Sequence, residues 1–217
     1  MTEFIWTHPS TASTATVLLA HGAGAPMDST FMEKMAASLA AEGVSVVRFE
    51  FGYMAQRRTG GGKRLPPKAE RLVGEFQTAL QMALQQIDGP LFIGGKSMGG
   101  RVAVMLAGGA SLPTRVRGVC VVGYPFHPTG KPDAPWRLAP LEAARRPVLV
   151  LQGERDPFGS KAELTAIELP EVIAISYLDD GNHDFGPRGK SPATLDGNIA
   201  EAARRIKRFA SEHAASS

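Results

Sequence analysis

The chain has 217 residues, of which 43% are hydrophobic and 21% are charged, and its formal net charge is +3. This balance suits one soluble globular domain, and no apolar run reaches the roughly 18 residues of a membrane span. The net charge is too small to indicate a nucleic-acid-binding protein, and the N-terminal residues lack the pattern of a signal peptide, so we expect a cytoplasmic protein.

Short runs rich in β-branched residues alternate along the chain with stretches of helical pattern. Strands are predicted at residues 2–7, 14–20, 44–49, 91–94, 118–123, 147–151 and 172–177. Helices are predicted at residues 30–42, 67–88, 98–107 and from the Ser191-Pro192 pair onward. The middle strands are continuously apolar, which is typical of strands buried on both faces. The alternation predicts a single α/β domain over residues 1–217, with a mostly parallel sheet of about seven strands flanked by helices on both faces.

Residues that favour helix ends support these bounds. Thr30 and Glu33 have the spacing of a capping box, and Gly43 suits the position just after a helix. Pro67 can begin the next helix, which Gly89 closes. The only cysteine, Cys120, lies in an apolar strand and is expected to be a buried, inert thiol.

Residues 91–100 read as a short buried strand, a serine between glycines and the start of a helix. The centre, Gly95-Lys96-Ser97-Met98-Gly99, fits G-x-S-x-G, the nucleophile elbow, in which a strained turn presents the serine above the sheet. The letters Gly-Gly-Lys-Ser also end the P-loop motif, but that motif needs glycine where the chain has Pro90. A glycine-rich turn without chemistry is the other alternative, so partner residues further along the chain decide between them.

Reactive residues follow the predicted strands, at the edge where parallel sheets bind ligands. Ser97, Asp156 and His183 each follow a strand, in the order Ser-Asp-His. A serine hydroxyl needs a base, which His183 can supply near neutral pH, and Asp156 can orient the imidazole. Glu154 is the competing acid, and Asp156 is preferred because the following Pro157 favours a turn that fixes its backbone.

An oxyanion formed at the substrate carbonyl would need preorganised hydrogen-bond donors. The backbone N–H of Met98 is one predicted donor. The loop after the strand at 14–20 is predicted to supply the second donor, from Ala23 or, as the close alternative, Gly24. His21 is expected to position this loop.

The stretch 124–147 is short and proline-rich, so it predicts an open cleft without a helical cap. Four aromatic side chains are expected to line this cleft: Phe51, Tyr53, Tyr124 and Phe126. His127 is expected in the cleft wall. The acidic cluster at 179–184 lacks the spacing of a calcium loop, so neither a metal nor a cofactor is predicted.

Residues 56–67 form a basic, glycine-rich segment that reads as a solvated loop. Its cations, Arg57, Arg58, Lys63 and Arg64, follow a strand and so lie at the same edge as the predicted site. They could therefore select a negatively charged substrate, and nucleic-acid binding is the less favoured alternative.

Four motifs, at residues 21–24, 95–100, 153–157 and 181–184, together resemble the α/β-hydrolase superfamily. More narrowly, they are similar to the small lidless group related to dienelactone hydrolases, which includes the testis-expressed and chromatin-complex hydrolase-like proteins. The resemblance covers about residues 14–209 and implies the α/β-hydrolase fold. Dienelactone hydrolases have a cysteine nucleophile where this chain has Ser97, so their substrate is not implied. Lys96 is also unusual at its position, and a salt bridge to a nearby acid is our hypothesis for it.

The predicted function is that of a serine hydrolase, a carboxylesterase or thioesterase-like enzyme that acts on a small or exposed ester through an acyl-Ser97 intermediate. The alternative keeps the fold and changes the role, to a hydrolase-like interaction protein with a vestigial triad. Labelling of Ser97 by a fluorophosphonate probe discriminates between the two hypotheses.

Overall fold

The computed structural model describes residues 3–58, 60, 62, 65–110, 112–131 and 133–214. Its strands are β1 (Phe4–Thr7), β2 (Ala15–Ala20), β3 (Val44–Phe49), β4 (Leu91–Lys96), β5 (Val116–Val122), β6 (Val148–Gly153) and β7 (Ile173–Leu178). Its helices are α1 (Thr30–Ala41), α2 (Gly52–Arg58), α3 (Ala69–Leu84), α4 (Met98–Gly108), α5 (Ala139–Glu142), α6 (Lys161–Leu164) and α7 (Leu195–His213).

The strands form one sheet in the order β1-β3-β2-β4-β5-β6-β7. Only β1 runs antiparallel to its neighbour, and the other pairs are parallel. The expected mostly parallel sheet of seven strands is therefore confirmed. The chain first adds strands on one side of β2 and then, from β4 onward, on the other. The carboxyl ends of β2 and β4 meet at this reversal, which is where open α/β sheets bind ligands.

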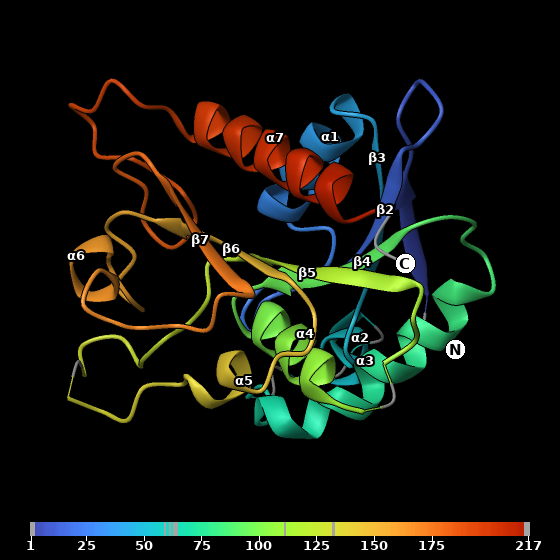
Figure 1. Cartoon of the computed structure of the whole chain (residues 1–217), viewed down its shortest axis with the longest axis horizontal. Coiled ribbons are helices and arrows are strands. Elements are labelled where there is room, and N and C mark those ends of the chain that lie inside the picture. The colour runs from blue at the N-terminus through green and yellow to red at the C-terminus, as the bar shows by residue number, and fades with distance from the viewer. Residues whose placement is uncertain are drawn as a thin grey trace.

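Helices cover both faces of the sheet, with α1 and α7 on one side and α3, α4 and α5 on the other (Figure 1). Consecutive residues of β4 explain why this strand is apolar up to Lys96, its last residue. Phe92 packs in the cluster beneath α1 and α7, and Ile93 packs in the cluster beneath α3 and α4. Because successive side chains of a strand point to opposite faces, a strand covered on both sides is mostly apolar on both.

Several helix ends differ from the sequence-based expectation. The N-cap of α1 is Ser29, whose side chain makes no capping bond, so the capping box at Thr30 and Glu33 is wrong. Gly43 does take the left-handed conformation, with φ of +81°. The last helix begins after Thr194, whose side chain accepts a hydrogen bond from the N–H of Gly197, and not at Ser191. The second predicted helix is shorter, because α3 spans Ala69–Leu84.

Three helices were not expected. They are α2, α5 and α6, which are 7, 4 and 4 residues long. Elements of one or two turns carry too few positions to show a helical period. The predicted loop at 56–67 thus begins inside α2, and its residues Thr59, Gly61, Lys63 and Arg64 lie outside the described residues. None of the described helices is both long and apolar enough to cross a membrane.

Candidate active site

Ser97 lies where β4 ends and α4 begins, as the G-x-S-x-G motif predicts. Its backbone has φ of +51° and ψ of −113°, a conformation that non-glycine residues rarely adopt. The flanking glycines are required by space. A Cβ atom on Gly95 would lie 2.5 Å from the carbonyl carbon of Gly99, and one on Gly99 would lie 2.4 Å from the carbonyl oxygen of His21. The strand and the helix therefore approach closely around the serine.

The structure brings Ser97, His183 and Asp156 together in one hydrogen-bonded line. The Oγ of Ser97 lies 2.8 Å from Nε2 of His183, and Nδ1 of His183 lies 2.8 Å from Oδ2 of Asp156. Asp156 is fully buried, and its other carboxylate oxygen accepts a bond from the N–H of Phe158 at 2.9 Å. The ring of Phe158 packs on His183 with a centroid distance of 4.4 Å. Neighbours therefore fix both the carboxylate and the imidazole.

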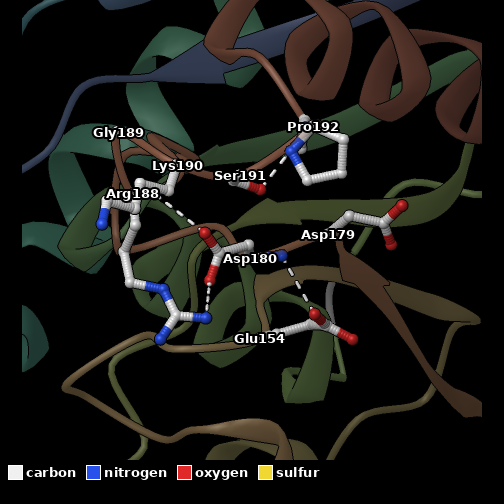
Figure 2. Close-up of a pocket in the computed structure, with 9 residues that line it drawn as sticks. Glu154, Asp179, Asp180, Arg188, Gly189, Lys190, Ser191 and Pro192 are labelled. Carbon is white, nitrogen blue, oxygen red and sulfur yellow. Dashed lines mark hydrogen bonds and ion pairs between the residues drawn. The ribbon is translucent and has the colours of Figure 1, made fainter.

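Glu154, the competing acid, faces a different pocket. Its carboxylate accepts a hydrogen bond from the backbone N–H of Asp180 at 2.9 Å and pairs with Lys161 at 2.8 Å. Figure 2 shows Glu154 in the wall of another pocket, with Asp180, Arg188 and Ser191. The volume of this pocket is about 830 Å³, and Ser97, His183 and Asp156 do not line it. Asp156, not Glu154, is therefore the acid within reach of His183.

The loop after β2 passes next to Ser97. A Cβ atom on Gly22 would lie 3.8 Å from the Cβ of Ser97, and Ala23 lines both cavities beside the serine. Met98, the other predicted oxyanion donor, is the first residue of α4, so its N–H has no intrahelical partner. Ala23, Ser97 and Met98 thus line one cavity.

His21 is buried beneath this loop. Its Nδ1 donates to the carbonyl oxygen of Gly22 at 2.6 Å, and its Nε2 accepts from the N–H of Phe51 at 3.1 Å. These bonds fix the neutral ring, and burial lowers the pKa of His21. The Tyr53 hydroxyl donates to the carbonyl oxygen of Ala23 at 3.0 Å, and burial raises the pKa of Tyr53 to about 12. The side chains of His21 and Tyr53 therefore hold the loop of Gly22 and Ala23 in place through its carbonyl oxygens.

Two cavities meet at Ser97. The first, of about 530 Å³, is lined in part by Phe31, Met32, Lys96 and His183, and the second, of about 540 Å³, in part by Lys68, Met98, Arg101 and Arg137. Phe158 and Ala23 line both. The predicted open cleft is therefore a pair of neighbouring cavities with the serine between them.

The expected aromatic lining of the cleft is wrong. Phe51, Tyr53, Tyr124 and Phe126 line neither of these cavities. Each is buried, because aromatic clusters take up these side chains. Phe51 packs on Phe49 at 5.3 Å between ring centroids, and Tyr124 packs on Phe126 at 4.8 Å.

Sequence reasoning missed Phe31, Phe158, Arg101 and Arg137 as lining residues. Two of them carried a signal, since Phe158 follows Asp156 by two residues and Arg101 lies one helical turn after Ser97. Phe31 comes from α1 and Arg137 from the segment before α5, and only the fold brings these two segments to the site.

Other predicted residues lie apart from these cavities. His127 is buried against Trp136, with its Nε2 at 3.4 Å from Glu163, so it is not in the cleft wall. Arg58 pairs with Asp28 at 2.6 Å and Glu50 at 2.8 Å, which neutralises its charge.

Asp180 and Asn182, of the acidic cluster at 179–184, make structural bonds. Asp180 pairs with Arg155 and Arg188, each at 2.7 Å, and the side chain of Asn182 accepts backbone N–H groups of its own turn. Within the part of the chain that the structure describes, no group of three or more His, Cys, Asp or Glu side chains could hold a metal ion.

Comparisons with known proteins agree with this architecture. A family model described as an alpha/beta hydrolase domain matches residues 13–211. Comparison with curated proteins gave no match. Among solved structures, the chain is similar to dienelactone hydrolase from Anabaena variabilis, with 20% identity, a TM-score of 0.69, and coverage of 98% of this chain and 92% of that one.

Two further solved structures are similar over nearly the whole chain. Est1E from Butyrivibrio proteoclasticus, with ferulic acid bound, has 13% identity, a TM-score of 0.70, and coverage of 99% of this chain and 96% of that one. A serine hydrolase without a lid from Xanthomonas campestris has 19% identity, a TM-score of 0.63, and coverage of 94% and 89%. At these identities the likeness establishes the fold.

Proposed function

Starting from the fact that this chain belongs to the alpha/beta hydrolase domain family, we propose that it is a serine hydrolase acting on carboxylic ester or thioester bonds. The observation that carries the proposal is the unbroken line from the Ser97 hydroxyl through His183 to buried Asp156, with both contacts at 2.8 Å. Such a line supplies a nucleophile, a base and a group that orients the base.

The reaction follows from these positions. His183 takes the proton of Ser97 as Oγ attacks the substrate carbonyl carbon, and the carbonyl oxygen becomes an oxyanion. The N–H groups of Met98 and Ala23 would stabilise this charge, and loss of one such donor typically costs about 2.7–4 kcal/mol. His183 then returns the proton to the leaving alcohol or thiol, and an acyl-Ser97 ester remains. Water, deprotonated by His183, cleaves this ester and restores the serine.

The similar structures support a small-molecule substrate. One is a dienelactone hydrolase, and another holds ferulic acid. The two cavities beside Ser97, each of more than 500 Å³, are of the size that small-molecule sites have. A small or exposed ester or thioester is therefore the proposed substrate class.

The test compares the wild-type protein with Ser97→Ala on a panel of 4-nitrophenyl esters and acyl thioesters, together with labelling by a fluorophosphonate probe. We expect the wild type to react with the probe and to turn over the esters, and Ser97→Ala to do neither. Equal turnover by the two proteins would contradict the proposal. A folded wild-type protein that neither hydrolyses esters nor takes up the probe would favour an interaction protein with a vestigial triad.

A further inference from the structure

The cavity on the Met98 side of Ser97 has an excess of positive charge. Three of its lining side chains are cations, Lys68, Arg101 and Arg137, and one is an anion, Glu70. These residues come from the start of α3, from α4 and from the segment before α5. Because the fold draws them from separate parts of the chain onto one wall, the charge is a property of this cavity and not of one basic segment.

Arg101 lies close to the nucleophile. Its backbone N–H donates to the carbonyl oxygen of Ser97 at 3.0 Å, so it stands one turn along α4, about 6 Å along the helix axis. Its Nη2 pairs with Glu70 at 2.8 Å, while its Nε is buried with no hydrogen-bond partner. Because a guanidinium group has five N–H donors and Arg101 lines the cavity, its bond to Glu70 leaves donors that an anion could accept.

Arg137 has a weaker set of partners. Its Nη1 donates to the carbonyl oxygen of Pro125 at 3.1 Å, and within the described residues no carboxylate lies within ion-pair distance of it. Burial and the nearby positive charge of Arg101 lower the pKa of Arg137. The guanidinium groups of Arg101 and Arg137 share this cavity and repel one another, and Glu70, which pairs with Arg101, offsets their charge only in part. A bound anion would relieve the remaining repulsion.

The other charged pocket gives a contrast. In the pocket of Figure 2, Arg188 pairs with Asp180 at 2.7 Å, and Glu154 and Asp179 add further negative charge. The cations of that pocket are balanced by its own acids, whereas those of the cavity lined by Met98, Arg101 and Arg137 are not.

The position of His183 indicates which end of a substrate enters the cationic cavity. His183 must return its proton to the leaving group, and it lines the cavity of Phe31. Met98, whose N–H would hold the oxyanion, lines the cationic cavity, which His183 does not. In the proposed reaction the leaving group therefore lies in the cavity lined by Phe31. The acyl chain lies in the cavity lined by Arg101 and Arg137.

We infer that Arg101 and Arg137 form a subsite for a carboxylate at the far end of the acyl chain. The substrates are then half-esters or half-thioesters of dicarboxylic acids, which acylate Ser97 through one carbonyl and place the free carboxylate between the two guanidinium groups. This inference rests on the proposed hydrolase function. Planar carboxylates and guanidinium groups form paired, charge-assisted hydrogen bonds, which suits this pairing.

The experiment compares two substrates that differ in charge. One is the 4-nitrophenyl half-ester of adipic acid, and the other is 4-nitrophenyl hexanoate, which has the same six carbons and no carboxylate. We expect a higher kcat/KM for the half-ester in the wild type. Arg137→Gln and Arg101→Gln should lower the ratio of the two kcat/KM values roughly ten- to hundredfold, which is the usual effect of losing a charged hydrogen bond.

Three further variants separate a subsite from a general effect of charge. Arg208→Gln removes one positive charge from an exposed position on α7 and should leave the ratio unchanged. Arg137→Lys keeps the charge and should restore part of the preference. Glu70→Gln removes the carboxylate that occupies Arg101 and should raise the ratio.

The outcomes distinguish this inference from the proposed function. Hydrolysis of the hexanoate that disappears in Ser97→Ala, with a ratio near one that the arginine variants do not change, overturns the carboxylate subsite and leaves the hydrolase standing. Absence of turnover of both esters, with no labelling of Ser97, overturns both. A series of half-esters from succinate to suberate then locates the chain length that best spans Ser97 and the arginines.

Discussion

The ammonium group of Lys96 donates a hydrogen bond to the backbone carbonyl oxygen of His183 at 2.9 Å. It also lies 3.1 Å from the carboxylate of Asp184 and 5.5 Å from the ring centroid of Phe31. Lys96 is the last residue of β4, directly before Ser97, whereas His183 lies in the loop after β7. The lysine thus ties the residue that carries the proposed base to the strand that carries the proposed nucleophile.

Lys96→Met should lower kcat, because the backbone of His183 loses its anchor and the imidazole loses its fixed distance from Ser97. We expect a decrease of about tenfold or more, since small misplacements of reacting groups cost up to about a hundredfold. KM should change little for neutral 4-nitrophenyl esters, and the rate of fluorophosphonate labelling should fall in parallel with kcat.

The control is Asp184→Asn, which removes the ion pair and leaves the bond from Lys96 to His183. It should reduce kcat less than Lys96→Met does.

The stability of the Lys96 variant gives a second readout. Burial lowers the pKa of Lys96 below the usual 10.5. Between these two pKa values the unfolded chain binds more protons than the folded protein, so the free energy of unfolding of the wild type rises with pH. Urea unfolding of Lys96→Met should lack this gain, and an unchanged kcat in this variant would contradict the anchoring role.

Asp156→Asn should lower kcat by about 10⁴, which is the effect of an uncharged partner that favours the wrong tautomer of the histidine. Glu154→Gln is the matched control, since Glu154 lies in the same loop and pairs with Lys161 and the N–H of Asp180. It should leave kcat within a few fold of the wild type. Circular dichroism shows whether each variant is folded, and a larger effect at Glu154 would contradict the assignment of the acid.

Ser97→Gly should be more stable to urea than Ser97→Ala by about 1 kcal/mol. The backbone at Ser97 has φ of +51°, where a side chain costs roughly 1–3 kcal/mol and glycine does not, while the extra freedom of glycine in the unfolded chain returns part of that gain. Both variants lack the hydroxyl, so comparing them isolates the strain. Equal midpoints would show that the strain is no larger than the roughly 0.5–1 kcal/mol that the freedom of glycine costs.

The alternation of elements and the core of the site could be predicted because each has a local cause. Buried parallel strands are mostly apolar, and the close approach at Gly95 and Gly99 requires glycine. The chain order of Ser97, Asp156 and His183 also follows from strand ends alone. Each of these features is signalled by a short stretch of sequence, a strand or the turn that follows it.

The lining of the cleft could not be predicted, because it depends on which side chains the core takes up. Phe51 and Tyr124 follow strands as the reactive residues do, yet aromatic neighbours bury both. Phe31 and Arg137 reach the cavities from segments that are far from Ser97 in the chain. The charge of Arg58 was visible in the sequence, but its pairing with Glu50 was not.

His21 gives a prediction for pH. Its ring is neutral in the fold, because Nε2 accepts the N–H of Phe51 and a proton there would meet that donor. Burial lowers the pKa of His21 below the usual 6.5, so the unfolded chain binds more protons than the folded one just below that pH. The free energy of unfolding should therefore fall as the pH drops below about 6.5.

Urea unfolding from pH 7.5 to pH 5.5 checks this, with His21→Gln as the variant and His8→Gln, at an exposed position, as the control. His21→Gln should be less stable at pH 7.5 by roughly 1–3 kcal/mol, because a buried hydrogen-bond partner is lost. Its stability should then depend less on pH than that of the wild type or His8→Gln. Because His21 holds the loop of Gly22 and Ala23 beside Ser97, its protonation in the folded protein, which requires a pH below its lowered pKa, should also lower kcat. An equal pH slope for all three proteins would show that His21 is not the group that titrates.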